Sequence, residues 1–114
     1  MKKILVINSD KDLLYNISGF LENKNYVVIG TMPGEDAVDL AQACMPGLIL
    51  IDAMDGDEVC GRLKSDVRTH LIPILLMSVE INQALLKGEC HADDFIEKPF
   101  VLKTLLFKIQ ALMA

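Results

Sequence analysis

The stretch Pro46-Gly47-Leu48-Ile49-Leu50-Ile51-Asp52 decides the fold of this chain. Four apolar residues follow the breaker pair Pro46-Gly47 and lead directly to the carboxylate of Asp52 and the turn-forming pair Asp55-Gly56. A short apolar run between turn signals is typical of a strand buried on both faces, as in the middle of a parallel sheet. Ligands of such sheets bind just beyond the carboxyl ends of the strands, where Asp52 stands. Asp52 therefore has two interpretations, a functional carboxylate or the N-cap of the following helix.

Composition limits the classes of protein to which the chain can belong. It has 114 residues, 52% of them hydrophobic, and a formal net charge of −5. This length predicts a single domain over residues 1–114 with a substantial core. The acidic balance argues against nucleic-acid binding, which needs a basic surface. Because no apolar run is long enough for a membrane span or a signal peptide, we predict a cytoplasmic protein. The three cysteines are widely spaced, which predicts reduced thiols: Cys44, Cys60 and Cys90.

Short apolar runs alternate with segments of helical periodicity along the whole chain. Besides the run at 48–51, strands are predicted at Ile4–Ile7, Tyr26–Ile29, Ile72–Met77 and Phe95–Ile96. Helices are predicted from apolar positions within 13–21, 37–44, 59–67, 81–86 and 101–113, the first capped by Asp10 and the third beginning around Gly56 to Glu58. Five strands alternating with five helices predict an α/β fold with a parallel sheet covered on both faces.

Polar residues follow several of these strands at the same edge of the predicted sheet. Asp52, Ser78 and Lys98 each stand at the carboxyl end of a strand, and Asn8 and Ser9 end the first strand. A carboxylate, a hydroxyl and an ammonium that converge on one edge form a site suited to an anionic group, and phosphate is the obvious candidate. Each residue also has a plain structural interpretation, but their matching positions on separate strands favour the functional one.

Four segments of the chain, in this order and spacing, resemble the receiver domains of bacterial two-component response regulators. The resemblance covers essentially the whole chain and implies a flavodoxin-like, doubly wound sheet with strand order 2-1-3-4-5. The segments are KILVINSD (3–10), PGLILIDAMDGDEVCGRLK (46–64), IPILLMS (72–78) and HADDFIEKPF (91–100).

The resemblance also implies roles for single residues. Asp52 resembles the aspartate that accepts a phosphoryl group from the phosphohistidine of a sensor histidine kinase. Ser78 resembles the switch hydroxyl, Phe95 the switch aromatic, and Lys98 the lysine that pairs with the phosphate and with Asp52. A cis Lys98–Pro99 peptide bond is implied as well. Further implications are a signalling domain that is not an enzyme, and a homodimer through the last two helices and the last strand.

The sequence departs from the family pattern at the metal site. Receivers usually end the first strand with two adjacent acidic residues that hold Mg²⁺, where this chain has Asn8 and Ser9. The stretch between Asp52 and the Asp-Gly of the next helix is also about four residues shorter than in the family. By resemblance, the metal ligands would be Asp52, the backbone carbonyl of Met54, and weakly Asn8 and Ser9.

This departure predicts weak Mg²⁺ binding. Mg²⁺ prefers oxygen ligands, usually including one or two carboxylates. Here one carboxylate faces one lysine, so the attraction for a cation is much reduced. Because phosphoryl transfer relies on positioning and on charge neutralisation by the metal, we expect phosphorylation of Asp52 to be slow or absent. Asp55 or Asp57, brought closer by the short loop, could restore part of the site.

Three hypotheses on function remain open at this point. The first is a receiver of a two-component phosphorelay that takes a phosphoryl group at Asp52, with weak, Mg²⁺-dependent phosphorylation. The second is a pseudo-receiver, an interaction module that binds a partner regardless of phosphorylation. An enzyme on the same fold is disfavoured, because the sequence has no Ser/His/Asp set, Gly-rich phosphate loop or nucleophilic cysteine in a recognisable setting.

Overall fold

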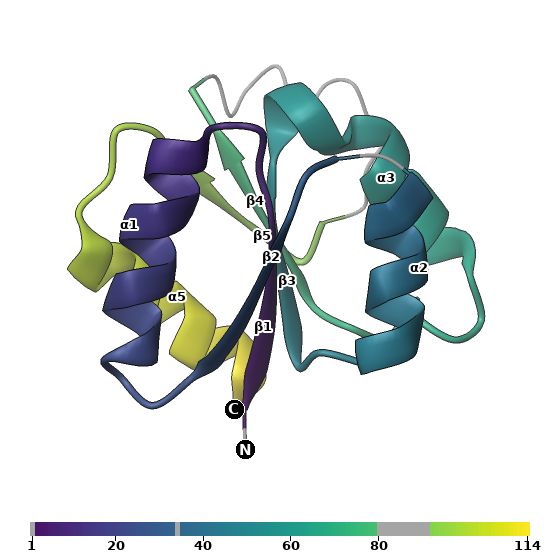
Figure 1. The fold of residues 1–114 in the computed structure, drawn as a ribbon, viewed down its shortest axis with the longest axis horizontal. Helices are drawn as coiled ribbons and strands as arrows, with labels where there is room; N and C mark the ends of the chain where they lie inside the picture. Colours follow the sequence, from purple (N-terminus) through teal and green to yellow (C-terminus); the bar gives the residue numbers. More distant parts are fainter. Residues whose placement is uncertain (1, 34, 80–91) are drawn as a thin grey trace.

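Five parallel strands form one sheet in the order β2-β1-β3-β4-β5, as predicted. The computed structural model describes residues 2–33, 35–79 and 92–114. Figure 1 shows the sheet edge-on in the centre of the molecule, with the amino end of β1 close to the carboxyl terminus of the chain. The strands are β1 (Lys3–Ile7), β2 (Val27–Thr31), β3 (Leu48–Asp52), β4 (Ile74–Ser78) and β5 (Asp94–Glu97).

Helices cover both faces of this sheet. In Figure 1, α1 (Lys11–Glu22) and α5 (Leu102–Met113) lie on one side, and α2 (Glu35–Cys44) and α3 (Ala53–Ser65) lie on the other. The side chain of Asp10 accepts the backbone N–H groups of Asp12 and Leu13, so Asp10 is the N-cap that the sequence predicts. The helix predicted within 81–86 lies outside the described residues, and the described part of the chain contains four helices.

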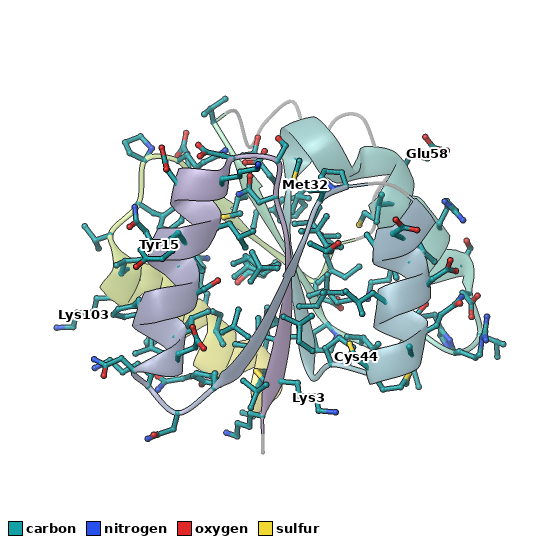
Figure 2. The ribbon with its side chains drawn as sticks, viewed as in Figure 1. Lys3, Tyr15, Met32, Cys44, Glu58 and Lys103 are labelled. Carbon is teal, nitrogen blue, oxygen red and sulfur yellow. The ribbon has the colours of Figure 1, made fainter. Side chains whose placement is uncertain are left out.

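The alternation of side chains along β1 and β3 divides the core between the two faces. Ile4, Val6, Leu48 and Leu50 pack against α1 and α5, whereas Leu5, Ile7, Ile49 and Ile51 pack against α2 and α3. Figure 2 shows these two layers of side chains on either side of the strands. Every residue of β3 is buried, which explains why the run at 48–51 is apolar without a break. Among the described residues, no helix is both long and apolar enough to cross a membrane.

Helix α3 differs from its prediction at both ends. It begins at Ala53, directly after β3, and not around Gly56 to Glu58. Ala53 and Met54 are strong helix formers, so the helix continues through the Asp55-Gly56 pair that resembled a turn. At its other end α3 stops at Ser65, and Val67 is 83% exposed, although its spacing predicted a core position. Val67 therefore matches the helical spacing of the apolar residues only by chance, since it lies beyond the end of α3.

Lys64, near the end of α3, joins this helix to the amino ends of two strands. Its ammonium donates to the Asp93 carboxylate at 2.7 Å and to the carbonyl oxygens of Ile72 at 3.1 Å and His70 at 3.3 Å. The same Asp93 oxygen accepts the backbone N–H of Ile74 at 2.7 Å. This cluster links α3 to the amino ends of β4 and β5.

The prediction of reduced thiols is wrong for Cys60. This residue is fully buried on α3 and is disulfide-bonded. Spacing along the sequence does not show which cysteines come within bonding distance, because that depends on the fold. Cys44, at the end of α2, is a free cysteine.

Candidate functional site

The sheet register brings the predicted site residues to one edge. Asn8 directly follows β1, and its backbone N–H donates to the Thr31 carbonyl oxygen at 3.1 Å. Asp52 ends β3 opposite Met77 of β4, and Ser78 ends β4. Lys98 follows β5, where its backbone N–H donates to the Ser78 carbonyl oxygen at 2.8 Å. The polar residues therefore lie next to one another across β1, β3, β4 and β5, as the sequence predicts.

Asp52 and Lys98 form a direct ion pair at this edge. The Lys98 ammonium donates a hydrogen bond to Asp52 Oδ2, across 46 positions of sequence. The Asp52 side chain is 5% exposed and the Lys98 side chain 21% exposed. A charge-assisted hydrogen bond of this kind is stronger than a neutral one. The pair keeps a carboxylate buried at the sheet edge and holds a cation beside it. The Lys98–Pro99 bond that precedes α5 is cis, as predicted.

The other two residues with predicted switch roles lie on the opposite face of the sheet from this pair. Phe95 packs, partly buried, against the core cluster formed with α2 and α3. Ser78 is 7% exposed and follows Leu76 in the alternation of β4, which directs it to the same face. Asp52 follows Leu50 in β3, so by the same alternation it is directed to the face of α1 and α5.

Asn8 is oriented by its own backbone. Its amide oxygen accepts the backbone N–H of Asp10 at 2.8 Å, which is the bond of an Asx-turn. Since a backbone N–H can only donate, this bond assigns the oxygen and the nitrogen of the amide without ambiguity. The nitrogen, Nδ2, is buried and has no hydrogen-bond partner among the described residues. Asn8 therefore uses its oxygen locally and directs N–H donors into the protein.

The reactivity of Cys44 bears on the enzyme hypothesis. Burial raises the pKa of the Cys44 thiol, an effect that the positive charge of Lys3 opposes only in part. The thiol is therefore protonated near neutral pH and is a poor nucleophile. Lys3 and Cys44 also lie at the end of the molecule opposite Met32, which follows the carboxyl end of β2 (Figure 2). Cys44 is thus remote from the Asp52 edge.

The comparison with protein families shows to which family the chain belongs. The response regulator receiver domain matches residues 4–110. The chain belongs to the response regulator receiver family. It is 34% identical over 119 residues to the DNA-binding dual master transcriptional regulator RpaA of Synechocystis sp., covering 99% of this chain and 49% of that protein. The receiver spans about half the length of the curated relatives that it matches.

Solved structures agree with this assignment. The receiver domain of a signal transduction histidine kinase from Syntrophus aciditrophicus is similar with a TM-score of 0.89 at 27% identity, covering 99% of this chain and 90% of that one. The receiver domain of the sensor histidine kinase PA1611 from Pseudomonas aeruginosa has a TM-score of 0.88 over 98% of this chain and 97% of that one. At 20% identity that second likeness concerns the fold alone, although its own active-site cleft coordinates a magnesium ion.

Receivers of this family interact with sensor kinases and typically bind Mg²⁺ in the active site. The donor set described here does not fit a magnesium ion well. Asp52 is engaged by Lys98, and Asn8 has committed its oxygen to Asp10. Met54 lies in the first turn of α3, where a helical carbonyl points along the helix axis toward the N–H four residues on. No group of three or more His, Cys, Asp or Glu residues that could hold a metal occurs in the described part of the chain.

The remaining candidate metal ligands are Ser9, Asp55 and Asp57. Ser9 is exposed and takes part in an interaction within the protein, so it is not a free ligand. The side chains of Asp55 and Asp57 lie outside the described part of the structure. The orientation of Asn8 was not predicted from the sequence, although the spacing Asn8-Ser9-Asp10 is that of an Asx-turn and would have indicated it.

Proposed function

We propose that this chain is a receiver of a two-component phosphorelay, with Asp52 as the phosphoacceptor and with weak, slow phosphorylation that depends on Mg²⁺. The Asp52–Lys98 ion pair at the carboxyl edge of the sheet is the observation that carries this proposal. A phosphoacceptor needs an ionised carboxylate and a cation to balance the charge of the incoming phosphoryl group, and the pair supplies both.

In the proposed reaction, a carboxylate oxygen of Asp52 attacks the phosphorus atom of a sensor kinase phosphohistidine. The new O–P bond forms as the P–N bond breaks, and the imidazole nitrogen keeps the electron pair of that bond. The product is an acyl phosphate on Asp52. Lys98 then shifts its hydrogen bond from the carboxylate to a phosphate oxygen. Ser78, which ends β4 at the same sheet edge as Asp52, turns its hydroxyl over this edge to donate to the phosphate, and Phe95 changes its packing behind Ser78.

The slow rate follows from the poor fit of the site to a divalent cation. One carboxylate and one ammonium leave the edge close to neutral, so the site lacks the negative charge that concentrates Mg²⁺. The amide nitrogen of Asn8 is a hydrogen-bond donor and cannot bind a cation. Phosphoryl transfer depends on positioned charges around the transferring group, and this receiver offers fewer of them.

The test is the intact mass of the protein after incubation with acetyl phosphate, with and without Mg²⁺. We expect a small phosphorylated fraction in the wild type and none in Asp52→Asn. A variant with Asn8→Asp and Ser9→Asp should reach a clearly larger fraction in Mg²⁺. Rapid, complete phosphorylation of the wild type would contradict the slow reaction. Equal labelling of the wild type and Asp52→Asn would show that the phosphoryl group goes elsewhere.

A second candidate function is a pseudo-receiver that acts through protein contacts alone. The commitment of Asn8 to its Asx-turn and the helical start of α3 at Ala53 both favour it, because both weaken the metal site. The outer face of α5 is suited to such contacts: Phe107 is 72% exposed and Val101 66% exposed. We propose a homodimer through this face together with β5 and the segment around 81–86, which the sequence predicts to be a helix. Sedimentation equilibrium of the wild type and Phe107→Asp tests it, with dimer expected only in the wild type.

A further inference from the structure

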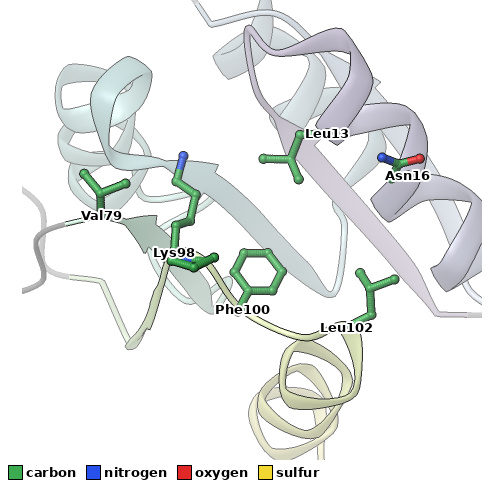
Figure 3. A pocket seen from close by; sticks show the side chains of 7 residues that line it. Leu13, Asn16, Val79, Lys98, Phe100 and Leu102 are labelled. Atoms are coloured by element: carbon green, nitrogen blue, oxygen red, sulfur yellow. The ribbon is translucent and has the colours of Figure 1, made fainter.

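A hollow of about 670 Å³ lies on the α1 and α5 side of the sheet, immediately beside the Asp52–Lys98 pair. It is bounded by the first turns of α1, the carboxyl end of β4 and the segment that joins β5 to α5 (Figure 3). Its volume is in the range of small-molecule sites in proteins. The residues around it are Leu13, Asn16, Val79, Lys98, Pro99, Phe100 and Leu102.

Most of the wall is apolar. Leu13, Phe100 and Leu102 pack against the core cluster on one side and border the hollow on the other. Val79 is 55% exposed, so an apolar side chain faces water at the rim. Covering such surface with an apolar molecule is favourable by about 25 cal/mol per Å² removed from water.

Two polar groups interrupt this apolar wall, and one of them is charged. In Figure 3, Lys98 and Asn16 stand on opposite sides of the hollow, with Leu13 between them. The Lys98 ammonium has three N–H donors, and its bond to Asp52 Oδ2 uses one of them. It can therefore bond a further acceptor that enters from the hollow. No acidic side chain is among the described residues that line the hollow.

We propose that this hollow binds a small organic carboxylate with an apolar body, its carboxylate bonded to Lys98. The positive charge of Lys98 disfavours a cationic ligand. A singly charged carboxylate suits the site better than a doubly charged phosphate ester, because Asp52 already neutralises part of the Lys98 charge and repels additional negative charge. The apolar wall fits an aromatic ring system or a medium-length alkyl chain.

This ligand would regulate the same edge that receives the phosphoryl group, so this consequence rests on the proposed function. A bound carboxylate occupies a second donor of the Lys98 ammonium and opposes its shift to the phosphate. Ligand binding and phosphorylation then oppose each other, and the coupling between them is reciprocal. The extent of phosphorylation would then fall as the concentration of the organic acid rises.

The experiment uses naphthalene-2-carboxylate and decanoate as probes, with naphthalene-2-carboxamide as the uncharged control, in two-dimensional NMR titrations of the wild type. No phosphodonor is present. We expect both acids to shift amide resonances at the start of α1 and over 98–102, and naphthalene-2-carboxylate to bind about tenfold tighter than its amide. Equal affinities for acid and amide, shifts elsewhere on the protein, or no binding by either acid would overturn the proposal.

Two matched valine variants keep the test specific. Val79→Glu places a negative charge at the rim of the hollow, and Val67→Glu places it at another exposed site, which is 83% exposed and not among the lining residues. Val79→Glu should weaken the acid at least about tenfold and Val67→Glu should leave it unchanged. Equal effects of the two substitutions would also overturn the proposal. Asp52→Asn can bind the acid but cannot be phosphorylated. Binding of the acid by this variant therefore tests the hollow independently of the proposed phosphorelay function.

Discussion

Removing the ammonium of Lys98 should destabilise the fold through Asp52. In Lys98→Met the Asp52 carboxylate stays in place, 5% exposed, without its charged partner. Removal of one partner from a fully buried ion pair typically costs about 3–5 kcal/mol. Here Lys98 is 21% exposed and Asp52 takes part in further interactions, so water and neighbours compensate in part. We therefore expect a loss of about 1–3 kcal/mol, the range for an unsatisfied hydrogen-bonding group.

The loss can be expressed as a melting temperature. An unfolding entropy of about 2.1 cal/mol/K per residue amounts to roughly 240 cal/mol/K for 114 residues, so each kcal/mol shifts the midpoint by about 4 °C. Lys98→Met should accordingly melt about 4–12 °C below the wild type. The wild type should hardly respond to millimolar Mg²⁺, because stabilisation by a ligand depends on its concentration relative to the dissociation constant.

The assay is thermal unfolding followed by circular dichroism, with and without Mg²⁺. Lys103→Met is the matched control, since Lys103 is an exposed lysine of α5 and should lose little. Adding Asp52→Asn to Lys98→Met removes the carboxylate charge that Lys98 balanced and should recover part of the loss. The reasoning from a neutral Asp52–Lys98 pair is refuted if Lys98→Met and Lys103→Met have the same melting temperature. It is also refuted if Mg²⁺ raises the melting temperature of the wild type by several degrees.

Three further predictions follow from the metal site, the Lys64 cluster and the loop after α3. Replacing Asn8 and Ser9 by Asp should tighten Mg²⁺ binding at least about tenfold in an NMR titration, and unchanged affinity would mean that other groups supply the ligands. Lys64→Met should lose about 1–3 kcal/mol in urea unfolding, because it removes the ammonium from the Asp93 carboxylate and from two carbonyl oxygens, whereas exposed Arg62→Met should lose little. The pKa of Asp66 is lowered by hydrogen bonds, first of all by the one that the Arg68 backbone N–H donates to its carboxylate. The stabilisation that Asp66 contributes to the fold is therefore complete above its ordinary pKa and is lost as pH falls through the lowered pKa. Asp66→Asn should remove that acid-side component from a plot of unfolding midpoint against pH, and an unchanged plot would contradict it.

The apolar periodicity of the sequence was enough to predict the sheet. Each strand buries side chains against helices, and β3 buries both faces, so a strand can be recognised from a few neighbouring residues. The residues that end these strands were predicted for the same reason, since the carboxyl ends of parallel strands share one edge. The pairing of Asp52 with Lys98 could be predicted from this shared edge together with the resemblance to receivers.

Other features depend on residues that are distant in the sequence and meet only after packing. The start of α3 at Ala53 is an exception, because it follows from the local helix preference of Ala53 and Met54, although the Asp55-Gly56 pair indicated a turn. The disulfide at Cys60 and the Lys64 cluster require segments brought together by the sheet. Local patterns carry no information about such distances, because the period of a strand or helix is the same whatever lies against it.

The site itself shows the same division. The sequence by itself determined which residue types reach the carboxyl edge: one carboxylate, one lysine, a hydroxyl and an asparagine in place of an acid. Only the tertiary structure decided that the Asn8 oxygen is committed to Asp10, and that α1 and the segment after β5 leave an apolar hollow beside Lys98. The physical reason is that burial patterns are set by the hydrophobic effect, which is not directional, whereas hydrogen bonds and cavities depend on the position of single atoms.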